Sequence, residues 1–376
     1  MRKVDYLIRG GHVIDSVRGI DGIEDLAVKN GKLVSAQEVS AAQVIDASGC
    51  IVTPGLIDFH CHLGRYFTDL GLEGETTCFP SGVTTAVDAG TSGTANYEAF
   101  RRETFYGRLR VKAYLNVCPA GLVTTAYHEN LDPACFHEEK LIRFLQKYRD
   151  QLLGLKIRQS KELVGARGLD PMKRMLEIAE KAGCPVVVHT TNPPVQVEEL
   201  ARLLRAGDVY AHIYQGKGES VVRDGRVVAE MFDHQKRGVI YDAANGTNHF
   251  SLDVAVRCLE EGLLPDIIST DLTVKSLFIP GKVFSLSAVL SKYLALGMPL
   301  AEIIRRATAN PARLLGEEKE LGSLSEGTCA DIAIHRLVDH HSVFTDFFGR
   351  ELVGKQLLRT ELTMREGEVV FRQIEF

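Results

Sequence analysis

Two histidines lie two residues apart at the end of an apolar run, in the stretch LIDFHCH. Side chains two apart on a β-strand point to the same face, so His60 and His62 could hold one ion while Cys61 points to the opposite side. Imidazole nitrogens are common zinc ligands, but a His-x-His pair on a strand also occurs without a metal. The pair therefore indicates metal chemistry only if other polar side chains meet it.

A lysine interrupts a second apolar run, LLGLKIR, at position 156. Burial disfavours the charged form of a lysine, so the amine of Lys156 becomes neutral and nucleophilic if this run is buried. Such an amine can add carbon dioxide to give a carbamate, whose two oxygens can bridge two metal ions. The residue alone leaves an alternative open, in which its ammonium pairs with a carboxylate inside the fold.

Three further polar residues end apolar runs of the same kind: His189 in PVVVHTT, His212 in VYAHIYQ and Asp271 in DIISTDL. A single histidine at a strand end is commonly a hydrogen-bonded structural residue. Stability does not account for four histidines, a lysine and an aspartate at the ends of different runs, because strand ends need few such groups. The set therefore predicts a metal site whose imidazole and carboxylate donors suit Zn²⁺.

These polar residues need a scaffold that brings distant strand ends together. From residue 53 onward, short and almost continuously apolar runs alternate with segments of helical period, which is typical of parallel strands covered by helices. Eight such runs over about 260 residues predict a (β/α)8 TIM barrel, in which reactive groups gather at the carboxyl ends of the strands. An open doubly wound sheet could also hold eight strands, but no G-x-G-x-x-G follows the first one.

Both ends of the chain have a different pattern. Short alternating β-like runs there are separated by turns containing Gly, Asn and Asp. We expect one small β-sandwich made from both ends around the inserted barrel. Its first part would be residues 1–52, the barrel residues 53–320 and its second part residues 321–376.

The composition excludes several classes of protein. The 376 residues carry a formal net charge of -5 without a basic stripe, so we expect no nucleic-acid partner. No apolar stretch approaches the ~20 residues that span a bilayer, and no signal peptide follows the basic start, so we expect no membrane association. The eight cysteines occur without a C-x-x-C pair, which is typical of reduced thiols in a cytoplasmic protein.

The sequence resembles the amidohydrolase superfamily over nearly its whole length. VTPGLIDFHCHL is similar to the first-strand signature of that superfamily, GVTTAVDAG to its second strand and ATANPARLLG to its helix after the barrel. GSLSEGTCADIAI resembles the segment that re-enters the sandwich. Within the superfamily, GLKIRQS, HIYQGKG and STDL with the later GKVFSLSAVLSKYLALGM look most like the dihydroorotase-like group of deacetylases.

The resemblance implies a centre with two divalent metal ions. His60, His62 and Asp271 would hold the first ion, His189 and His212 the second, and carbamylated Lys156 would bridge the two. Zn²⁺ suits these donors, and Mn²⁺ or Fe²⁺ would bind less tightly. A hydroxide between the ions would attack the substrate, and Asp271 would take its proton and pass it to the leaving group.

Substrate recognition is expected from side chains near the mouth of the barrel. Arg158 shares the face of Lys156 and could clamp a carboxylate through two nitrogens; a structural ion pair with a loop carboxylate is the alternative. Asn245 replaces the histidine expected after the seventh strand in this family and His249 follows nearby, so both are further substrate-binding candidates. Gly64 stands where dihydroorotases have an arginine, which argues against dihydroorotate as the substrate.

We therefore predict a hydrolase that removes an N-acyl or O-acyl group, acetyl above all, from a small α-substituted carboxylic acid, and we expect a homo-oligomer. A cyclic amidase of the dihydroorotase or hydantoinase type would keep all the ligands and differ in its pocket. A purine or pyrimidine deaminase would use one ion and no bridging lysine, so Lys156 argues against it. A non-catalytic assembly protein, as some hydantoinase relatives are, would have lost ligands, and none is missing here.

Overall fold

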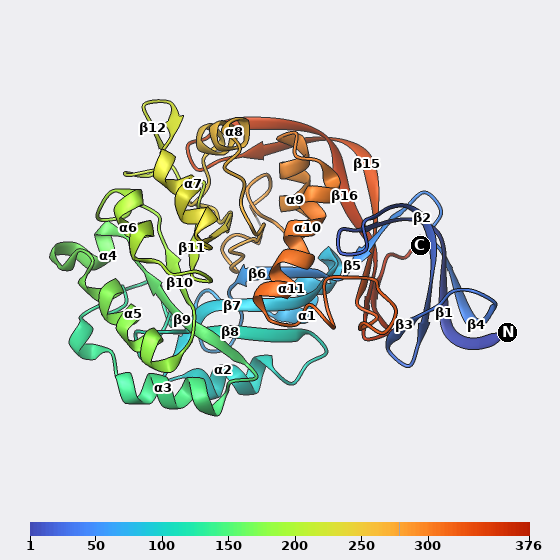
Figure 1. Cartoon of the computed structure of the whole chain (residues 1–376), viewed down its shortest axis with the longest axis horizontal. Coiled ribbons are helices and arrows are strands. Elements are labelled where there is room, and N and C mark those ends of the chain that lie inside the picture. Colours follow the sequence, from blue (N-terminus) through green and yellow to red (C-terminus); the bar gives the residue numbers. More distant parts are fainter. Residues whose placement is uncertain (278) are drawn as a thin grey trace.

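A parallel sheet of seven strands forms the centre of the computed structural model, which describes residues 1–277 and 279–376 (Figure 1). Each strand of this sheet lies beside the next one along the chain. The strands are β6 (Leu56–Cys61), β7 (Val83–Gly93), β8 (Arg110–Asn116), β9 (Leu152–Arg158), β10 (Val186–His189), β11 (Val209–Ala211) and β14 (Ile240–Asp242). Every residue of β6, β7 and β10 is buried, as the continuous apolar runs predicted.

The predicted eighth strand closes the sheet through isolated pairings rather than as a continuous strand. Asp242 at the end of β14 pairs with Ile267, and Cys61 at the end of β6 pairs with Leu272, both in parallel. The ladder is interrupted because Asp271 has a φ of 51°, which lies outside the range of a strand. The sheet therefore curls back on itself like a TIM barrel, and its last segment is held partly by irregular backbone.

Helices lie between the strands and cover the sheet (Figure 1). They are α1 (Gly74–Cys78), α2 (Tyr97–Thr104), α3 (Glu138–Lys147), α4 (Lys161–Val164), α5 (Asp170–Ala182), α6 (Val197–Leu203), α7 (Ala229–Lys236), α8 (Leu252–Glu261), α9 (Leu286–Ala295), α10 (Leu300–Ala307) and α11 (Ala309–Leu314). Short 3₁₀ turns cover Phe79–Ser81, Pro133–Cys135 and Gly165–Arg167, and a small hairpin is formed by β12 (Val222–Arg223) and β13 (Arg226–Val227). The pattern of α5 explains its position, because its buried residues Met172, Met175 and Ile178 recur at helical spacing on one face. Among the described residues, no helix combines the length and the apolar character needed to cross a membrane.

Strands from both ends of the chain form one mixed sheet beside the barrel (Figure 1). They are β1 (Arg2–Asp15), β2 (Ile20–Lys29), β3 (Lys32–Val34), β4 (Val39–Asp46), β5 (Ile51–Pro54), β15 (Ile332–Thr345), β16 (Glu351–Arg365) and β17 (Glu368–Arg372). The antiparallel pairing of β5 with β15 joins the two ends, and buried residues from both, including Val28, Val52 and Ile334, share one apolar core. The two-layer sandwich and the domain boundaries stay predictions.

The hairpin of β15 and β16 extends from this sheet along α9 towards α8 (Figure 1). The amide of Leu358 donates to Oγ of Ser291 in α9 at 2.9 Å, which ties the hairpin to the barrel. At its tip, Asp346 accepts from the amide of Leu252 at 2.9 Å, and the amide of Phe347 donates to the carbonyl of Phe250 at 3.1 Å. The C-terminal hairpin therefore supports the start of α8 and the loop that precedes it.

Candidate metal centre

The predicted polar residues lie together at one edge of the parallel sheet. Lys156 pairs in register with Val187, two residues before His189, and His189 pairs with both Arg158 and Ala211. His212 follows directly after β11, at the same edge. This register places Lys156, His189 and His212 side by side because parallel strands end at the same side of the sheet.

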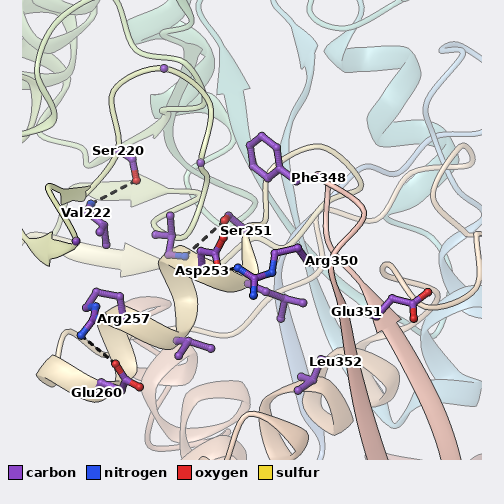
Figure 2. Close-up of a pocket in the computed structure, with 16 residues that line it drawn as sticks. Ser220, Val222, Ser251, Asp253, Arg257, Glu260, Phe348, Arg350, Glu351 and Leu352 are labelled. Atoms are coloured by element: carbon purple, nitrogen blue, oxygen red, sulfur yellow. Dashed lines mark hydrogen bonds and ion pairs between the residues drawn. The ribbon is translucent and has the colours of Figure 1, made fainter.

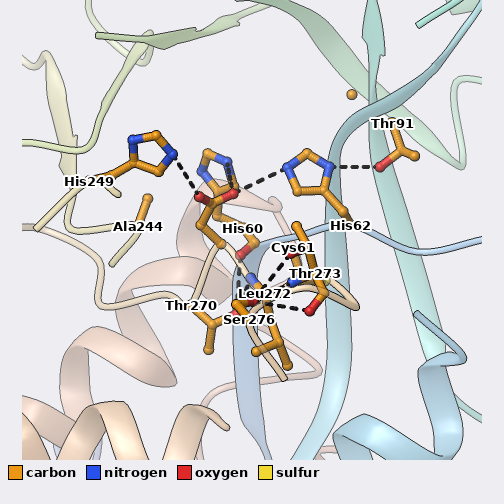
Figure 3. A network of polar contacts seen from close by, with 12 residues as sticks. His60, Cys61, His62, Thr91, Ala244, His249, Thr270, Leu272, Thr273 and Ser276 are labelled. Carbon is orange, nitrogen blue, oxygen red and sulfur yellow. Dashed lines mark hydrogen bonds and ion pairs between the residues drawn. The ribbon is translucent and has the colours of Figure 1, made fainter. Parts of the chain in front are cut away.

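One carboxylate oxygen lies between the two histidines of β6 and its extension. Oδ1 of Asp271 is 3.2 Å from Nε2 of His62 and 3.6 Å from Nε2 of His60. Figure 3 shows His62 between Thr91 and the centre of this network. The potential ligand atoms that the resemblance assigns to the first ion therefore lie close together.

A second group of imidazoles lies beside the first. The rings of His189 and His212 have centroids 4.3 Å apart, and the ring of His212 is 5.2 Å from that of His60. Nζ of Lys156 is 3.2 Å from Nε2 of His60. The structure thus brings together all six residues that the resemblance assigned to the two ions.

Each of three rings is held at Nδ1 by a partner behind it. Nδ1 of His60 donates to Asp242 at 3.0 Å, and Nδ1 of His212 donates to the carbonyl of Ala244 at 2.6 Å. Nδ1 of His62 lies 2.8 Å from the hydroxyl of Thr91, which in turn donates to Asp88. Metal-binding histidines are commonly held in this way, because the outer hydrogen bond fixes the ring and leaves Nε2 free to bind.

The sequence analysis missed these supporting residues. Asp88 in TTAVDAG and Asp242 in GVIYDAA are aspartates within buried runs, and each is fully buried in the fold. An unpaired buried carboxylate is costly, so its presence in an apolar strand is the signal that could have indicated a partner. Nothing in the sequence pattern indicates Thr91 or the carbonyl of Ala244.

The donor set fits a metal ion. Nε2 of His212 is buried and has no hydrogen-bond partner within the described part of the chain. An unmade bond of this kind costs about 1–3 kcal/mol, which a ligand would offset. Ligand atoms of His60, His212 and Asp271 lie within 4.8 Å of one another, and nitrogen with carboxylate oxygen is a donor set that suits Zn²⁺.

Burial also places these groups in the protonation state that metal binding needs. It lowers the pKa of His60, His189 and His212 well below the usual value of imidazole, so each ring keeps a lone pair at neutral pH. Burial lowers the pKa of Lys156 to about 8, although the charge of Asp271 opposes this change. The neutral amine of Lys156 is therefore more populated near neutral pH than that of an exposed lysine, although it stays the minor form.

The three predicted substrate-binding residues lie in different environments. Nε of Arg158 donates to Glu129 at 2.7 Å, and its Nη2 bonds to the other oxygen of the same carboxylate. Asn245 is fully buried, and its amide donates to the carbonyl of Ser269 at 3.2 Å. His249 lies near the centre, with Nε2 3.6 Å from Oδ2 of Asp271, on the side of the network opposite His62 (Figure 3).

A further cation near the site was missed from the sequence. Lys217 is half-buried in the loop after His212, and its ammonium lies 3.8 Å from the centre of the ring of Phe347. No ion pair of Lys217 occurs among the described residues. Burial lowers the pKa of His249 to about 4; the charge of Asp271 opposes this change and the charge of Lys217 adds to it.

A separate cavity of about 720 Å³ lies between α8, the loop after β11 and the tip of the hairpin (Figure 2). Four of its charged lining residues form ion pairs, Arg350 with Asp253 and Arg257 with Glu260. Ser251 lines it and caps α8 through the amide of Val254. The six candidate metal ligands do not line this cavity, and we assign it no ligand.

Buried imidazole and carboxylate groups at the strand ends of a parallel barrel are typical of metal-dependent hydrolases. The profile of the amidohydrolase family matches residues 51–354. The chain belongs to the amidohydrolase family, and it is a hydrolase of carbon–nitrogen bonds. Both the resemblance and the class of enzyme predicted from the sequence are confirmed.

Individual relatives carry several different activities. The chain is 33% identical to the deacetylase Atu3266 of Agrobacterium fabrum over 341 residues, which cover 89% of this chain and 82% of that protein. The crystal structure of an adenine deaminase matches with a TM-score of 0.91 at 26% identity and covers 98% of this chain and 100% of its own. A dihydroorotase structure matches with a TM-score of 0.86 at 29% identity, covering 99% and 97%. The family implies divalent metal ions, whereas the substrate differs between these proteins.

Proposed function

We propose that this protein is a deacetylase with two divalent metal ions. Its substrate would be a small carboxylic acid that carries an N-acyl or O-acyl group, acetyl above all, on the α-carbon. The observation that carries the proposal is the convergence of His60, His62, Lys156, His189, His212 and Asp271 at one buried edge of the sheet. The similarity to deacetylases over most of the chain supports the same reaction.

The two ions would be held by this chain as the resemblance implies, with His60, His62 and Asp271 on one and His189 and His212 on the other. Zn²⁺ is the ion we favour, with Mn²⁺ or Fe²⁺ as alternatives, because the donors are imidazole and carboxylate. When bound, the ions would activate water for attack near neutral pH and polarise the scissile carbonyl.

Lys156 would join the two halves of the site as a carbamate. Its neutral amine would form a bond to the carbon of carbon dioxide and lose one proton, which leaves a carbamate with two oxygens. The lowered pKa of Lys156 supports this step, because the uncharged amine is the reacting form. The nearby Nε2 of His60 supports it too, since both groups then face the same place.

Asp271 would transfer the proton in the reaction. Its Oδ1 faces His60 and His62, while Oδ2 faces the other side of the site near His249. Oδ2 could therefore accept a proton from the attacking water and deliver it to the leaving nitrogen or oxygen. Because its two oxygens face different sides of the site, Asp271 could bind a metal ion through one oxygen and transfer a proton through the other.

The carboxylate of the substrate would meet two cations. Glu129 accepts one hydrogen each from Nε and Nη2 of Arg158, so the two N–H groups of Nη1 and the second one of Nη2 remain to bind a substrate, and the pair has little net charge. Lys217 brings a charge without a carboxylate partner in the described chain. We propose that Arg158 orients the acid group and that Lys217 supplies most of its electrostatic attraction.

A cyclic amidase is the second candidate, because a dihydroorotase structure matches almost the whole chain at 29% identity. Gly64 speaks against dihydroorotate itself, because dihydroorotases have an arginine at this position and the fold of this chain disfavours any side chain there. Gly64 has a φ of +91°, and a Cβ at this position would lie 2.1 Å from the ring of Phe67.

The test is a hydrolysis screen of metal-reconstituted enzyme against N-acetyl and O-acetyl derivatives of α-amino and α-hydroxy acids. Dihydroorotate and adenine serve as the competing substrates. We expect turnover of at least one acetylated acid and of neither competitor. Rapid hydrolysis of dihydroorotate without any turnover of acylated acids would instead establish the cyclic amidase, and release of ammonia from adenine would establish the deaminase.

A further inference from the structure

A seventh side chain approaches the candidate ligands from the loop after β14. The ring of His249 has its centroid 4.8 Å from that of His189 and 4.3 Å from that of His212. One ring nitrogen from each of these three histidines lies within 4.8 Å of the others. The three imidazoles therefore surround a space that one ion could occupy.

The ring of His249 is held in the same manner as a candidate ligand. Its Nδ1 lies 2.7 Å from the hydroxyl of Thr191, just as Nδ1 of His62 lies 2.8 Å from the hydroxyl of Thr91. Thr191 is buried and follows His189 by two residues, so the end of β10 provides one imidazole and the loop directly after it the residue that orients another. This contact directs Nε2 of His249 towards the centre of the site.

The backbone of the loop allows this close approach. Gly246 has a φ of +53°, and a Cβ at this position would lie 2.5 Å from Oδ2 of Asp271 and 2.5 Å from Cδ2 of His249. A side chain there would force one of the two groups away. Glycine at position 246 thus permits His249 and Asp271 to be neighbours, with Nε2 and Oδ2 3.6 Å apart.

Two ring nitrogens, one of them fully buried, point to a ligand at this position. Nε2 of His212 has no partner in the described part of the chain, although His212 is completely buried. Nε2 of His249 has only the long contact to Asp271, and the side chain of His249 is 20% exposed at the mouth. An ion between them would satisfy both nitrogens at once.

We propose that His249 is a third imidazole ligand of the second ion, together with His189 and His212. Three neutral imidazoles form a site that suits Zn²⁺ and adds no charge of its own. This inference rests on the two-ion site proposed above and is independent of the identity of the substrate. It differs from the substrate-binding role expected for His249 from the sequence.

The experiment measures metal binding rather than turnover. His249→Gln, His249→Ala and Thr191→Val are compared with the wild type and with a matched control, His128→Gln, whose histidine is exposed. Ions per chain are determined by elemental analysis after dialysis, and the affinity of each ion by titration against a chromophoric chelator. The thermal midpoint of each metal-free variant shows whether it is folded.

We expect both His249 variants to keep the first ion and to bind the second at least about 100-fold more weakly, because a direct ligand is lost. Thr191→Val should weaken binding of the second ion about 10-fold, the lower end of the usual loss of metal affinity when a residue that orients a ligand is replaced. Added imidazole should restore the second ion in His249→Ala, since the partly exposed position admits it. His128→Gln should match the wild type.

Two ions bound with wild-type affinity by His249→Gln and His249→Ala would overturn the inference. A raised KM in those variants would then assign His249 to the substrate. A wild-type protein that binds fewer than two ions would contradict the two-ion site itself, which is a different failure.

Discussion

Nζ of Lys156 lies 3.2 Å from Nε2 of His60 in the buried centre of the barrel. Because Nδ1 of His60 donates to Asp242, its Nε2 carries the lone pair and the lysine amine is the donor. The lysine can donate to this lone pair as an amine or as an ammonium, because burial lowers its pKa to about 8. The contact therefore shows how a lysine is accommodated in a buried strand.

Replacing Lys156 with alanine should remove most of the activity and loosen the second ion. The reason is that the carbamate would be the only group shared by both halves of the site. Lys156→Glu should retain more metal than Lys156→Ala, because a carboxylate can still bridge imperfectly, and short carboxylic acids with bicarbonate should partly rescue the alanine variant. Elemental analysis and turnover numbers check both points; full metal content and full rate in Lys156→Ala would exclude the bridging role.

The protein should contain close to two transition-metal ions per chain when it is produced with added zinc or manganese. One ion cannot satisfy donors that come from both sides of the site, with His62 on one side and His189 on the other. Removal of metal by a chelator should abolish activity, and added Zn²⁺ or Mn²⁺ should restore it. A clean content of one ion per chain, with Lys156 unmodified by mass spectrometry, would favour the deaminase instead.

Asp271→Asn should leave metal binding largely intact and slow turnover by roughly 10²–10⁴-fold, the usual effect of losing a positioned acid–base group. The amide oxygen can still face His60 and His62, but the amide cannot accept the proton from water. Steady-state kinetics with metal analysis of the same sample separates these effects. An unchanged kcat would assign proton transfer to another residue, and loss of both ions would make the role of Asp271 one of metal binding.

The barrel-like parallel sheet could be predicted from the sequence because its buried strands read as short, mostly apolar runs. The same runs indicated His189, His212 and Asp271 as candidate site residues, because a polar side chain at the end of a buried apolar run needs a hydrogen-bond partner or a ligand. The eighth strand is less regular than predicted because Asp271 adopts a positive φ, and such a conformation leaves no mark on the apolar pattern.

Other features depend on contacts that sequence spacing does not reveal. Glu129, which holds Arg158, lies 29 residues before it in a loop without periodicity. Thr91 orients the ring of His62 and Thr191 that of His249, and both threonines look like ordinary polar residues in the sequence. Lys217 and Phe347 are far apart in the chain and meet only because the C-terminal hairpin crosses the barrel. Side-chain pairing across the fold is therefore what the sequence alone could not provide.

A buried lysine outside the site should make stability depend on pH. Lys292 is buried in α9, where its ammonium lies 4.6 Å from the centre of the ring of Phe250, and burial lowers its pKa to about 7. Between about pH 7 and its ordinary value of 10.5 the unfolded chain binds more protons at this lysine than the folded one, so its contribution to stability rises with pH. The thermal midpoint of the wild type should therefore rise, relative to that of Lys292→Met, from about pH 7 to about pH 9. Parallel curves for the two proteins would show that Lys292 is charged in the fold.

Two matched substitutions test how the acid group of the substrate is recognised. Arg158→Met and Lys217→Met remove one charge each and keep much of the apolar contact of the side chain. Each should raise KM for an acylated acid by roughly 10-fold or more, the worth of a hydrogen bond to a charged group, and should barely affect the neutral amide or ester analogue. Both variants must be measured with the same acid and the same neutral analogue, because a general disturbance of the site would raise KM for both substrates equally. If only Lys217→Met discriminates between them, the ion pair of Arg158 with Glu129 is structural, and Lys217 alone binds the acid.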